Sequence, residues 1–112
     1  LYPLRPDHPD HNRARALLGA RGGHMVSFRI AGGRAAANAL VQAAPQIAFA
    51  PTLGDIGTTL SHPASSSHRA LSAEAREALG MTEGFFRISV GCEEIGGLKD
   101  AFSAAIAAAT AA

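Results

Sequence analysis

The chain has 112 residues, and ten Lys and Arg against nine Asp and Glu give it a formal net charge of +1 at pH 7. This length suits a single domain, and so small a charge argues against a dedicated nucleic-acid-binding protein, which needs a basic surface. Hydrophobic residues make up 47% of the chain, but 25 residues are alanine, so we expect a thin core.

The cysteine content and the lengths of the apolar runs bear on the cellular location of the protein. The single cysteine, Cys92, cannot form an internal disulfide, which favours a cytoplasmic protein over a secreted one. No apolar run reaches the ~20 residues of a membrane span, so we expect no membrane segment. The chain opens at Leu1 without the pattern of a signal peptide. We therefore expect a piece of a longer protein.

The N-terminal residues predict an irregular arm followed by a helix. Prolines are frequent at the start of the sequence, and each removes a backbone donor and disfavours helix in the residue before it. We expect the arm over residues 1–8. A helix should follow at about 9–18, with Asp7 as its N-cap and Gly19 as its stop.

The middle of the chain predicts a strand, a helix and a short second strand. Val26, Phe28 and Ile30 alternate with their neighbours in the period-two pattern of a strand. Residues 34–44 are rich in alanine and are followed by a proline, which indicates a helix. A short apolar run at 47–50 predicts the second strand.

The C-terminal half predicts a loop, a short helix, a strand and a final helix. A loop rich in Ser, Thr and His is expected up to about His68, and Ser72 should cap a helix at 73–79. The clearest strand is 85–90, in which Phe86, Ile88 and Val90 point to one side and Arg87 to the other. The final helix should bury the stripe Ile95, Leu98, Phe102 and Ile106.

This order of elements predicts an α/β fold, specifically an α+β two-layer sandwich. The apolar residues of the two longer strands should face the helices, together with Leu98 and Phe102. The opposite face of the sheet should be open.

Two groups of histidines suggest chemistry only weakly. His8 and His11 could share a metal ion if a third ligand came from elsewhere, but both fall in an exposed helix start. His62 and His68 flank three serines, yet the segment has no nucleophile elbow and no aspartate spaced to orient a base. We therefore predict neither a metal site nor a catalytic residue in this chain.

Arg87 is the candidate binding residue that the pattern itself singles out. It occupies the middle of a strand, on the face opposite the apolar side chains. Either the guanidinium faces solvent, or something outside this chain covers that face and the guanidinium holds a carboxylate in a bidentate pair.

Four segments resemble the C-terminal part of a known family. They are LYPLRPDHPDH, GGHMVSFRIAGG, TLGDIGTTLSHPASSSH and FFRISVGCEE. In order and spacing they are similar to the pyridoxal-phosphate (PLP)-dependent enzymes of Cys/Met metabolism, such as cystathionine γ-synthase, cystathionine γ- and β-lyases, methionine γ-lyase and the homoserine sulfhydrylases. The resemblance runs from Tyr2 to about Ile106.

The resemblance implies that residues 1–112 are the C-terminal small domain of a fold type I enzyme, with a small, mostly antiparallel sheet and helices on one face. PLP would be held by a large domain that lies outside this chain. Arg87 would bind the α-carboxylate of an amino-acid substrate, and Thr52, at the family's serine position in Ser-Leu-Gly, would lie beside it. The implied partners are the substrate, the large domain and further copies in a homo-oligomer, a tetramer in this family, with neither nucleic acid nor membrane.

The sequence departs from the family pattern at residues that bear on substrate choice. Pro51 stands where many synthases and γ-lyases have Glu, and Gly57 replaces another common Glu. Ser66 and Ser67 replace the usual pair before the second histidine. The sequence therefore leaves open the substrate and the choice between elimination and replacement.

The lysine content supports a role outside cofactor anchoring. Covalent attachment of PLP requires a lysine amine, and Lys99 on the final helix is the only lysine. We expect no cofactor-binding residue in this chain and no activity from the chain alone. The alternative is a free-standing, non-catalytic binding or assembly module that uses the same open sheet face.

Overall fold

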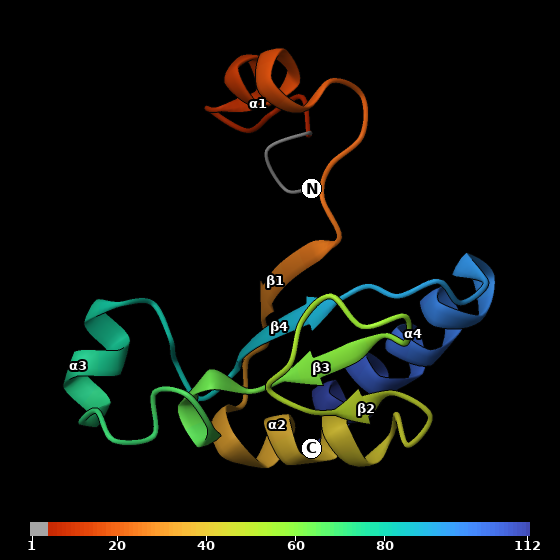
Figure 1. Ribbon diagram of the computed structural model, residues 1–112. Coiled ribbons are helices and arrows are strands. Elements are labelled where there is room, and N and C mark those ends of the chain that lie inside the picture. The colour runs from red at the N-terminus through yellow and green to blue at the C-terminus, as the bar shows by residue number, and fades with distance from the viewer. Residues whose placement is uncertain (1–4) are drawn as a thin grey trace.

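A four-stranded mixed sheet forms the centre of the computed structural model, which describes residues 5–112 (Figure 1). The strand order is β1-β4-β3-β2. The inner strand β4 is antiparallel to β1 and to β3, and only β2 runs parallel to its neighbour β3. The expected mostly antiparallel sheet is confirmed. The strands are β1 (Met25–Arg29), β2 (Ala48–Phe49), β3 (Thr59–Ser61) and β4 (Phe85–Ser89).

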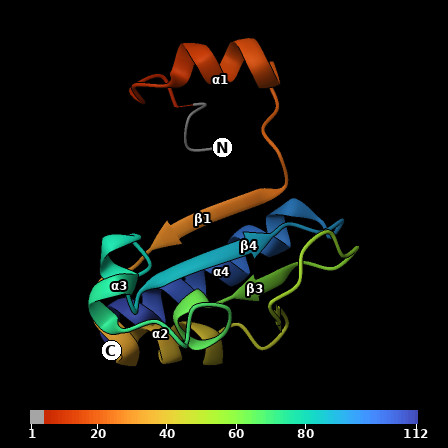
Figure 2. The same ribbon diagram turned by 60° about the vertical axis from the view of Figure 1, so that its left-hand side comes forward.

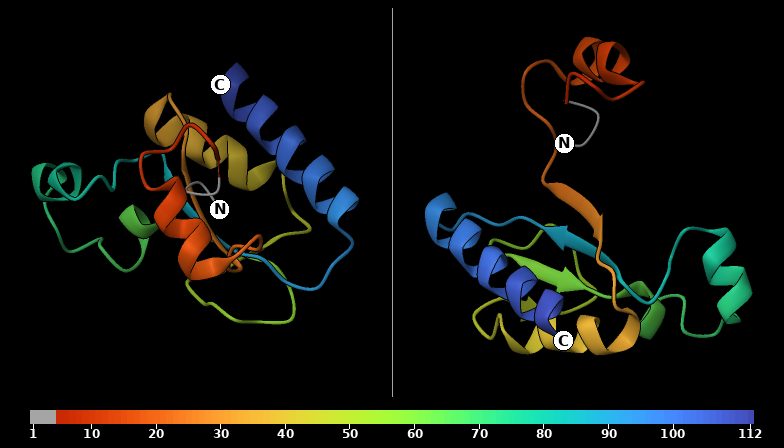
Figure 3. Two further views of the ribbon diagram at one scale, coloured as in Figure 1. Left: turned by 90° about the horizontal axis from the view of Figure 1, so that it is seen from above. Right: turned by 180° about the vertical axis from the view of Figure 1, so that it is seen from behind.

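Two long helices cover one face of this sheet. Helices α2 and α4 pack beside each other under it, which confirms the predicted two-layer fold (Figures 1 and 3). Helix α3 lies beyond one end of the sheet, and α1 stands apart on the side opposite α2 and α4 (Figure 2). The helices are α1 (His11–Leu18), α2 (Gly33–Gln42), α3 (Ala73–Ala78) and α4 (Ile95–Ala111), with a short 3₁₀ turn, η2, at Pro63–Ser65.

The register of the sheet places the apolar side chains toward the helices, as predicted. Phe86 and Ile88 of β4 are buried, and Leu60 of β3 pairs with Ile88 on the same face. Phe28 of β1 pairs with Phe86, and the two rings stack with centroids 5.5 Å apart. The predicted apolar layer of the sheet and α4 is therefore confirmed, with Val26, Ile30, Val90 and Phe102 packed partly buried against it.

The buried stripe of α4 differs from the predicted one. Ile95 and Ile106 are 58% and 43% exposed. Small side chains let a helix approach its neighbours closely, and here alanines provide most of the contact with the core. The buried residues of α4 are Leu98, Ala101, Ala105 and Ala109, at steps of three and four residues.

One strand was not predicted from the sequence. Residues 59–61 were predicted as part of a loop, but they form β3 between β2 and β4. The strand has only three residues, with Leu60 toward the helices and hydroxyl side chains on either side of it. So short an alternation cannot be recognised without its neighbours, since pairing with β4 provides its hydrogen bonds.

The helix ends agree in part with the predicted caps. The Ser72 hydroxyl accepts a hydrogen bond from the Ala75 N–H at 3.2 Å, as expected of an N-cap. The Asp7 cap was wrong, because that carboxylate pairs with the Arg5 guanidinium at 2.7 Å and α1 begins only at His11. Of the arm predicted over 1–8, residues 1–4 lie outside the described part. No helix within residues 5–112 has the length and apolar character needed to cross a membrane.

Phe86 should be essential to stability. Its ring is fully buried, whereas Phe49 on the edge strand β2 is 53% exposed. Phe86→Ala should lower the free energy of unfolding by about 3–5 kcal/mol, since it removes buried apolar surface and leaves a cavity. Urea denaturation measures this, with Phe49→Ala as the matched control. Equal losses for the two variants would contradict this account of the core.

Candidate functional site

Arg87 lies at the centre of a polar row across the face of the sheet opposite the helices. Its cross-strand partners are Ser27 on β1 and Ser61 on β3. The Ser61 hydroxyl lies 3.4 Å from the Arg87 carbonyl oxygen, to which it donates. Ser27 is exposed, so the face is open on the β1 side of Arg87. The predicted placement of Arg87 outside the core is therefore correct.

The Arg87 side chain is half-buried and has no partner within residues 5–112. Its Nε is buried and makes no hydrogen bond in this part of the chain. Two other arginines, Arg34 and Arg76, both pair with Glu83. A buried donor without a partner costs on the order of 1–3 kcal/mol. Residues 5–112 therefore hold a cation on the open face and provide no anion to neutralise it.

A loop that includes Thr52 is fixed to the same face of the sheet, over Ser89 and Thr59. The Ser89 hydroxyl, two residues beyond Arg87 on β4, accepts a hydrogen bond from the Gly54 N–H at 2.9 Å. The Thr59 hydroxyl donates to the Thr52 carbonyl oxygen at 3.1 Å, and Thr59 pairs with Ser89. The Thr52 side chain is exposed. Both predicted binding residues thus belong to one face, where the loop covers the Ser89 end and leaves the β1 end open.

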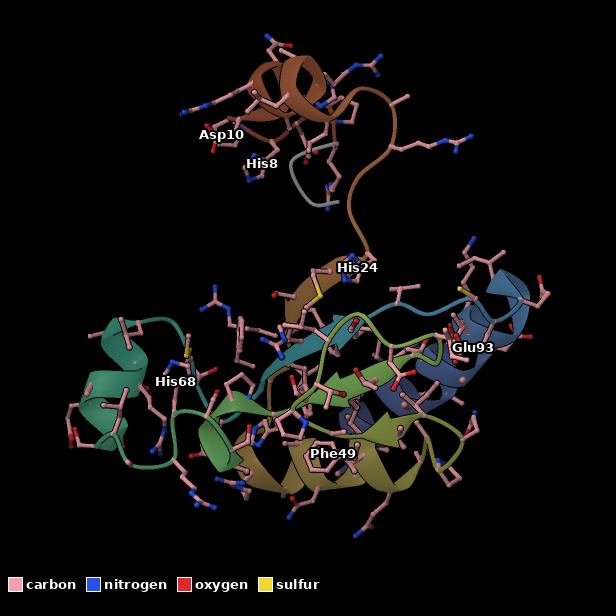
Figure 4. The ribbon with its side chains drawn as sticks, in the orientation of Figure 1. His8, Asp10, His24, Phe49, His68 and Glu93 are labelled. Atoms are coloured by element: carbon pink, nitrogen blue, oxygen red, sulfur yellow. The ribbon has the colours of Figure 1, made fainter. Side chains whose placement is uncertain are left out.

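Glu93 anchors the far end of this loop, a role that the sequence analysis did not foresee. Its carboxylate accepts hydrogen bonds from the Thr58 N–H at 2.6 Å and the Thr58 hydroxyl at 2.7 Å. The same hydroxyl accepts from the Gly91 N–H at 2.9 Å. Figure 4 shows Glu93 near the start of α4, at the opposite end of the sheet from His68. Nothing in the local sequence marks Glu93, because its partner is 35 residues away.

Glycine is required at the crossing between this loop and the end of β4. A Cβ on Gly91 would lie 2.4 Å from the Ile56 carbonyl oxygen and 2.5 Å from the Thr58 nitrogen. The Cys92 N–H donates to that Ile56 oxygen at 2.8 Å. The two backbones therefore run in direct contact, and Glu93 follows at once to bind Thr58.

Of the two histidines that flank the three serines, His62 is buried against the core. The His62 ring is 3% exposed and lies 4.9 Å from the Phe86 ring. Its Nδ1 lies 2.7 Å from the Ser65 hydroxyl and its Nε2 lies 2.6 Å from the Glu83 carbonyl oxygen. Arg34 also donates to that hydroxyl. His62 is thus a buried structural residue whose two ring nitrogens hold neighbouring segments.

The His8 and His11 segment likewise forms local contacts. The Nδ1 of His8 accepts a hydrogen bond from the Asp10 N–H at 3.0 Å. Within residues 5–112, no three His, Cys, Asp or Glu side chains are grouped so that they could hold a metal ion.

Lys99 does not fit a cofactor anchor for this site. It is exposed on α4, a helix that lies under the sheet, while Arg87 faces the other side (Figures 1 and 2). A lysine that holds PLP must reach the reacting carbon of a substrate whose carboxylate is bound nearby. Lys99 therefore does not have the position of such a lysine relative to Arg87.

The chain is similar to known proteins over nearly its whole length. Residues 1–107 match the family described as Cys/Met metabolism PLP-dependent enzyme. O-succinylhomoserine sulfhydrylase of Pseudomonas aeruginosa is 38% identical over 96% of this chain and 26% of its own length. Cystathionine gamma-lyase of Saccharomyces cerevisiae is 36% identical over 97% of this chain and 28% of its own length.

The solved structures include close matches of the same kind. Cystathionine gamma synthase of Xanthomonas oryzae pv. oryzae, in complex with aminoacrylate and cysteine, superposes with a TM-score of 0.79 and 37% identity. The match covers 97% of this chain and 28% of that one. Fold and sequence together define a region of a PLP-dependent enzyme. The chain belongs to the Cys/Met metabolism family and spans about a quarter of the length of the relatives named above.

The hydrogen bonds of the Glu93 carboxylate should contribute stability that is lost at acidic pH. The N–H and then the hydroxyl of Thr58 stabilise the carboxylate, so they hold the pKa of Glu93 below its ordinary value. A lowered carboxyl pKa gives stability that is complete above the unfolded pKa of about 4.3 and is lost as pH falls through the folded pKa. Glu93→Gln should therefore lose less stability between pH 5 and pH 3 than the wild type.

Thermal unfolding across this pH range measures the effect. The control is Glu77→Gln on α3, where the exposed carboxylate makes no hydrogen bond to a side chain or loop within residues 5–112. Parallel pH profiles for Glu93→Gln and the wild type would show that the Thr58 contacts do not stabilise the ionised form.

Proposed function

We propose that residues 1–112 are the C-terminal small domain of a PLP-dependent enzyme of sulfur amino acid metabolism, and that Arg87 binds the α-carboxylate of its substrate. The observation that carries the proposal is the Arg87 guanidinium, which is held on an open sheet face with no anion from residues 5–112. Family membership supports it, because amino acids that carry an α-carboxylate are bound in related structures.

The chemistry of arginine suits this role. Its planar guanidinium presents two parallel N–H donors to the two oxygens of a carboxylate, and it stays charged at all physiological pH values. A bound carboxylate would supply the acceptor that the Arg87 Nε lacks. Fixing the carboxylate also restricts rotation of the substrate about its α-carbon, so the bond to be broken keeps one orientation.

Thr52 is proposed to complete the carboxylate site. Its backbone is held to Thr59, and the neighbouring Gly54 is held to Ser89, the next residue along the same face from Arg87. Its exposed hydroxyl is free to turn toward a ligand at the edge of the open face. Thr52 would therefore limit where the second carboxylate oxygen can lie.

The rest of the activity is assigned to the part of the protein outside these 112 residues. We propose that a large domain holds PLP, which makes the 112-residue chain inactive alone, and that the whole enzyme is a cytoplasmic homo-oligomer. The names of the relatives support two reaction classes, C–S bond cleavage and replacement at an activated homoserine. Both classes act on a substrate with an α-carboxylate, so the role of Arg87 is the same in each.

Arg87→Ala in the full-length enzyme should lower kcat/KM by roughly 10²-fold or more, equivalent to about 2.7 kcal/mol at ~1.36 kcal/mol per decade. Arg87→Lys should fall between this variant and the wild type, because it keeps the charge and loses the paired donors. PLP affinity should not change. Steady-state kinetics and a titration of PLP into the apoenzyme measure the two effects.

Arg29→Ala is the matched control for charge on the same face. Arg29 is exposed on β1 and pairs with Phe85, two residues from Arg87. This variant should keep kcat/KM close to the wild-type value. A near-normal kcat/KM for Arg87→Ala, or a loss of PLP affinity in it, would remove Arg87 from the carboxylate-binding role.

A further inference from the structure

We infer that Glu93 is a positioning residue for the carboxylate site: through Thr58 it holds the 52–58 loop against β4, so that Thr52 stays beside Arg87. This inference rests on the proposed function of Arg87. Glu93 itself lies at the end of the loop farthest from Thr52 and is not proposed to touch the substrate.

The Glu93 carboxylate binds Thr58 through both of its oxygens. One carboxylate oxygen accepts from the Thr58 N–H at 2.6 Å and the other accepts from the Thr58 hydroxyl at 2.7 Å. Thr58 is 2% exposed, so both bonds are made at a buried residue. Hydrogen bonds to an ionised acceptor are about twice as strong as those between neutral groups. The two bonds therefore fix both the backbone and the side chain of Thr58.

Thr58 also links Glu93 to the end of β4, the strand that carries Arg87. Its hydroxyl donates to Glu93 and at the same time accepts from the Gly91 N–H, two residues beyond the end of β4. Because hydroxyl groups both donate and accept, one side chain joins the loop, the end of β4 and the start of the segment that leads to α4. Removing the hydroxyl would break both links.

The 52–58 loop is held by a small number of polar contacts, of which the Glu93–Thr58 anchor is one. Leu53 and Ile56 are 61% and 82% exposed and contribute little burial. The Thr59 hydroxyl holds the Thr52 carbonyl oxygen, Gly54 donates to Ser89, and the Ile56 oxygen accepts from Cys92, beyond the end of β4. With so little buried apolar surface, polar contacts determine where the loop lies.

The neighbouring carboxylate, Glu94, has a different role from Glu93. It accepts hydrogen bonds from the Gly96 and Gly97 N–H groups, both at 2.8 Å, and so caps the first turn of α4. Among the described residues it makes no hydrogen bond with the loop. Loss of Glu94 should lower stability through α4 and leave the position of Thr52 unchanged, so Glu94→Ala separates a stability effect from a positioning effect.

The test uses the full-length enzyme and L-norleucine, which carries an α-carboxylate but no sulfur to be eliminated. Glu93→Ala and Thr58→Val should each weaken norleucine binding about tenfold in calorimetry and speed hydrogen exchange at the 52–58 amides. The loss of norleucine affinity in these two variants should be smaller than in Arg87→Ala, because they keep the guanidinium. Thr58→Ser should restore both properties, since it keeps the hydroxyl. Glu94→Ala should change neither.

Three outcomes would overturn the inference. Faster exchange in the loop with unchanged norleucine affinity would make the Glu93–Thr58 contact purely structural. A loss of affinity in Glu94→Ala equal to that in Glu93→Ala would assign the effect to general stability. Failure of Thr58→Ser to restore binding would show that the hydroxyl is not the link.

Arg87→Ala, measured in parallel, separates this inference from the proposed function. If Arg87→Ala weakens norleucine binding and the Glu93 and Thr58 variants do not, the positioning role alone is wrong. If Arg87→Ala leaves norleucine binding unchanged, the carboxylate site is wrong and the positioning role is wrong with it.

Discussion

An arginine held on a sheet with no counter-ion from residues 5–112 is the constraint on which the proposed site depends. The Arg87 side chain extends from an inner strand, with a buried Nε that has no acceptor among residues 5–112. Such a donor destabilises the domain unless something else binds it. Arg34 and Arg76 are each paired with Glu83, whereas Arg87 has no such partner among residues 5–112. The arrangement is understandable if the missing acceptor arrives with a ligand.

Strand β4 contributes both to the core and to the proposed binding face, because successive side chains of a strand point to opposite faces. Phe86 and Ile88 anchor the core above α2 and α4, while Arg87 and Ser89 form the other face. A register shift of one residue would place the guanidinium in the core, so the burial of Phe86 fixes the direction of Arg87. Beyond β4, Gly91 and Glu93 hold the loop that brings Thr52 to this face. Core, cation and loop are therefore linked through one segment of chain.

The sequence predicted what depends on local periodicity and missed what depends on distant partners. The alternation in β1 and β4 was enough to place Phe28, Phe86 and Arg87 on their correct faces. The three-residue β3 and the Glu93–Thr58 contact were missed, since both form between segments that are 26 to 35 residues apart. Of the large residues assigned to the α4 stripe, Leu98 is buried and Phe102 partly buried, and alanines make up the rest of the buried face. Thr52 came from the family resemblance alone.

The most direct test of the central claim is a crystal structure of the full-length enzyme with L-norleucine bound. We expect both carboxylate oxygens to accept hydrogen bonds from the Arg87 guanidinium, within the 2.7–2.9 Å typical of charge-assisted N–H···O bonds, with the 52–54 segment beside them. A carboxylate bound by other residues, with Arg87 facing solvent or paired with a carboxylate of the protein itself, would contradict the account.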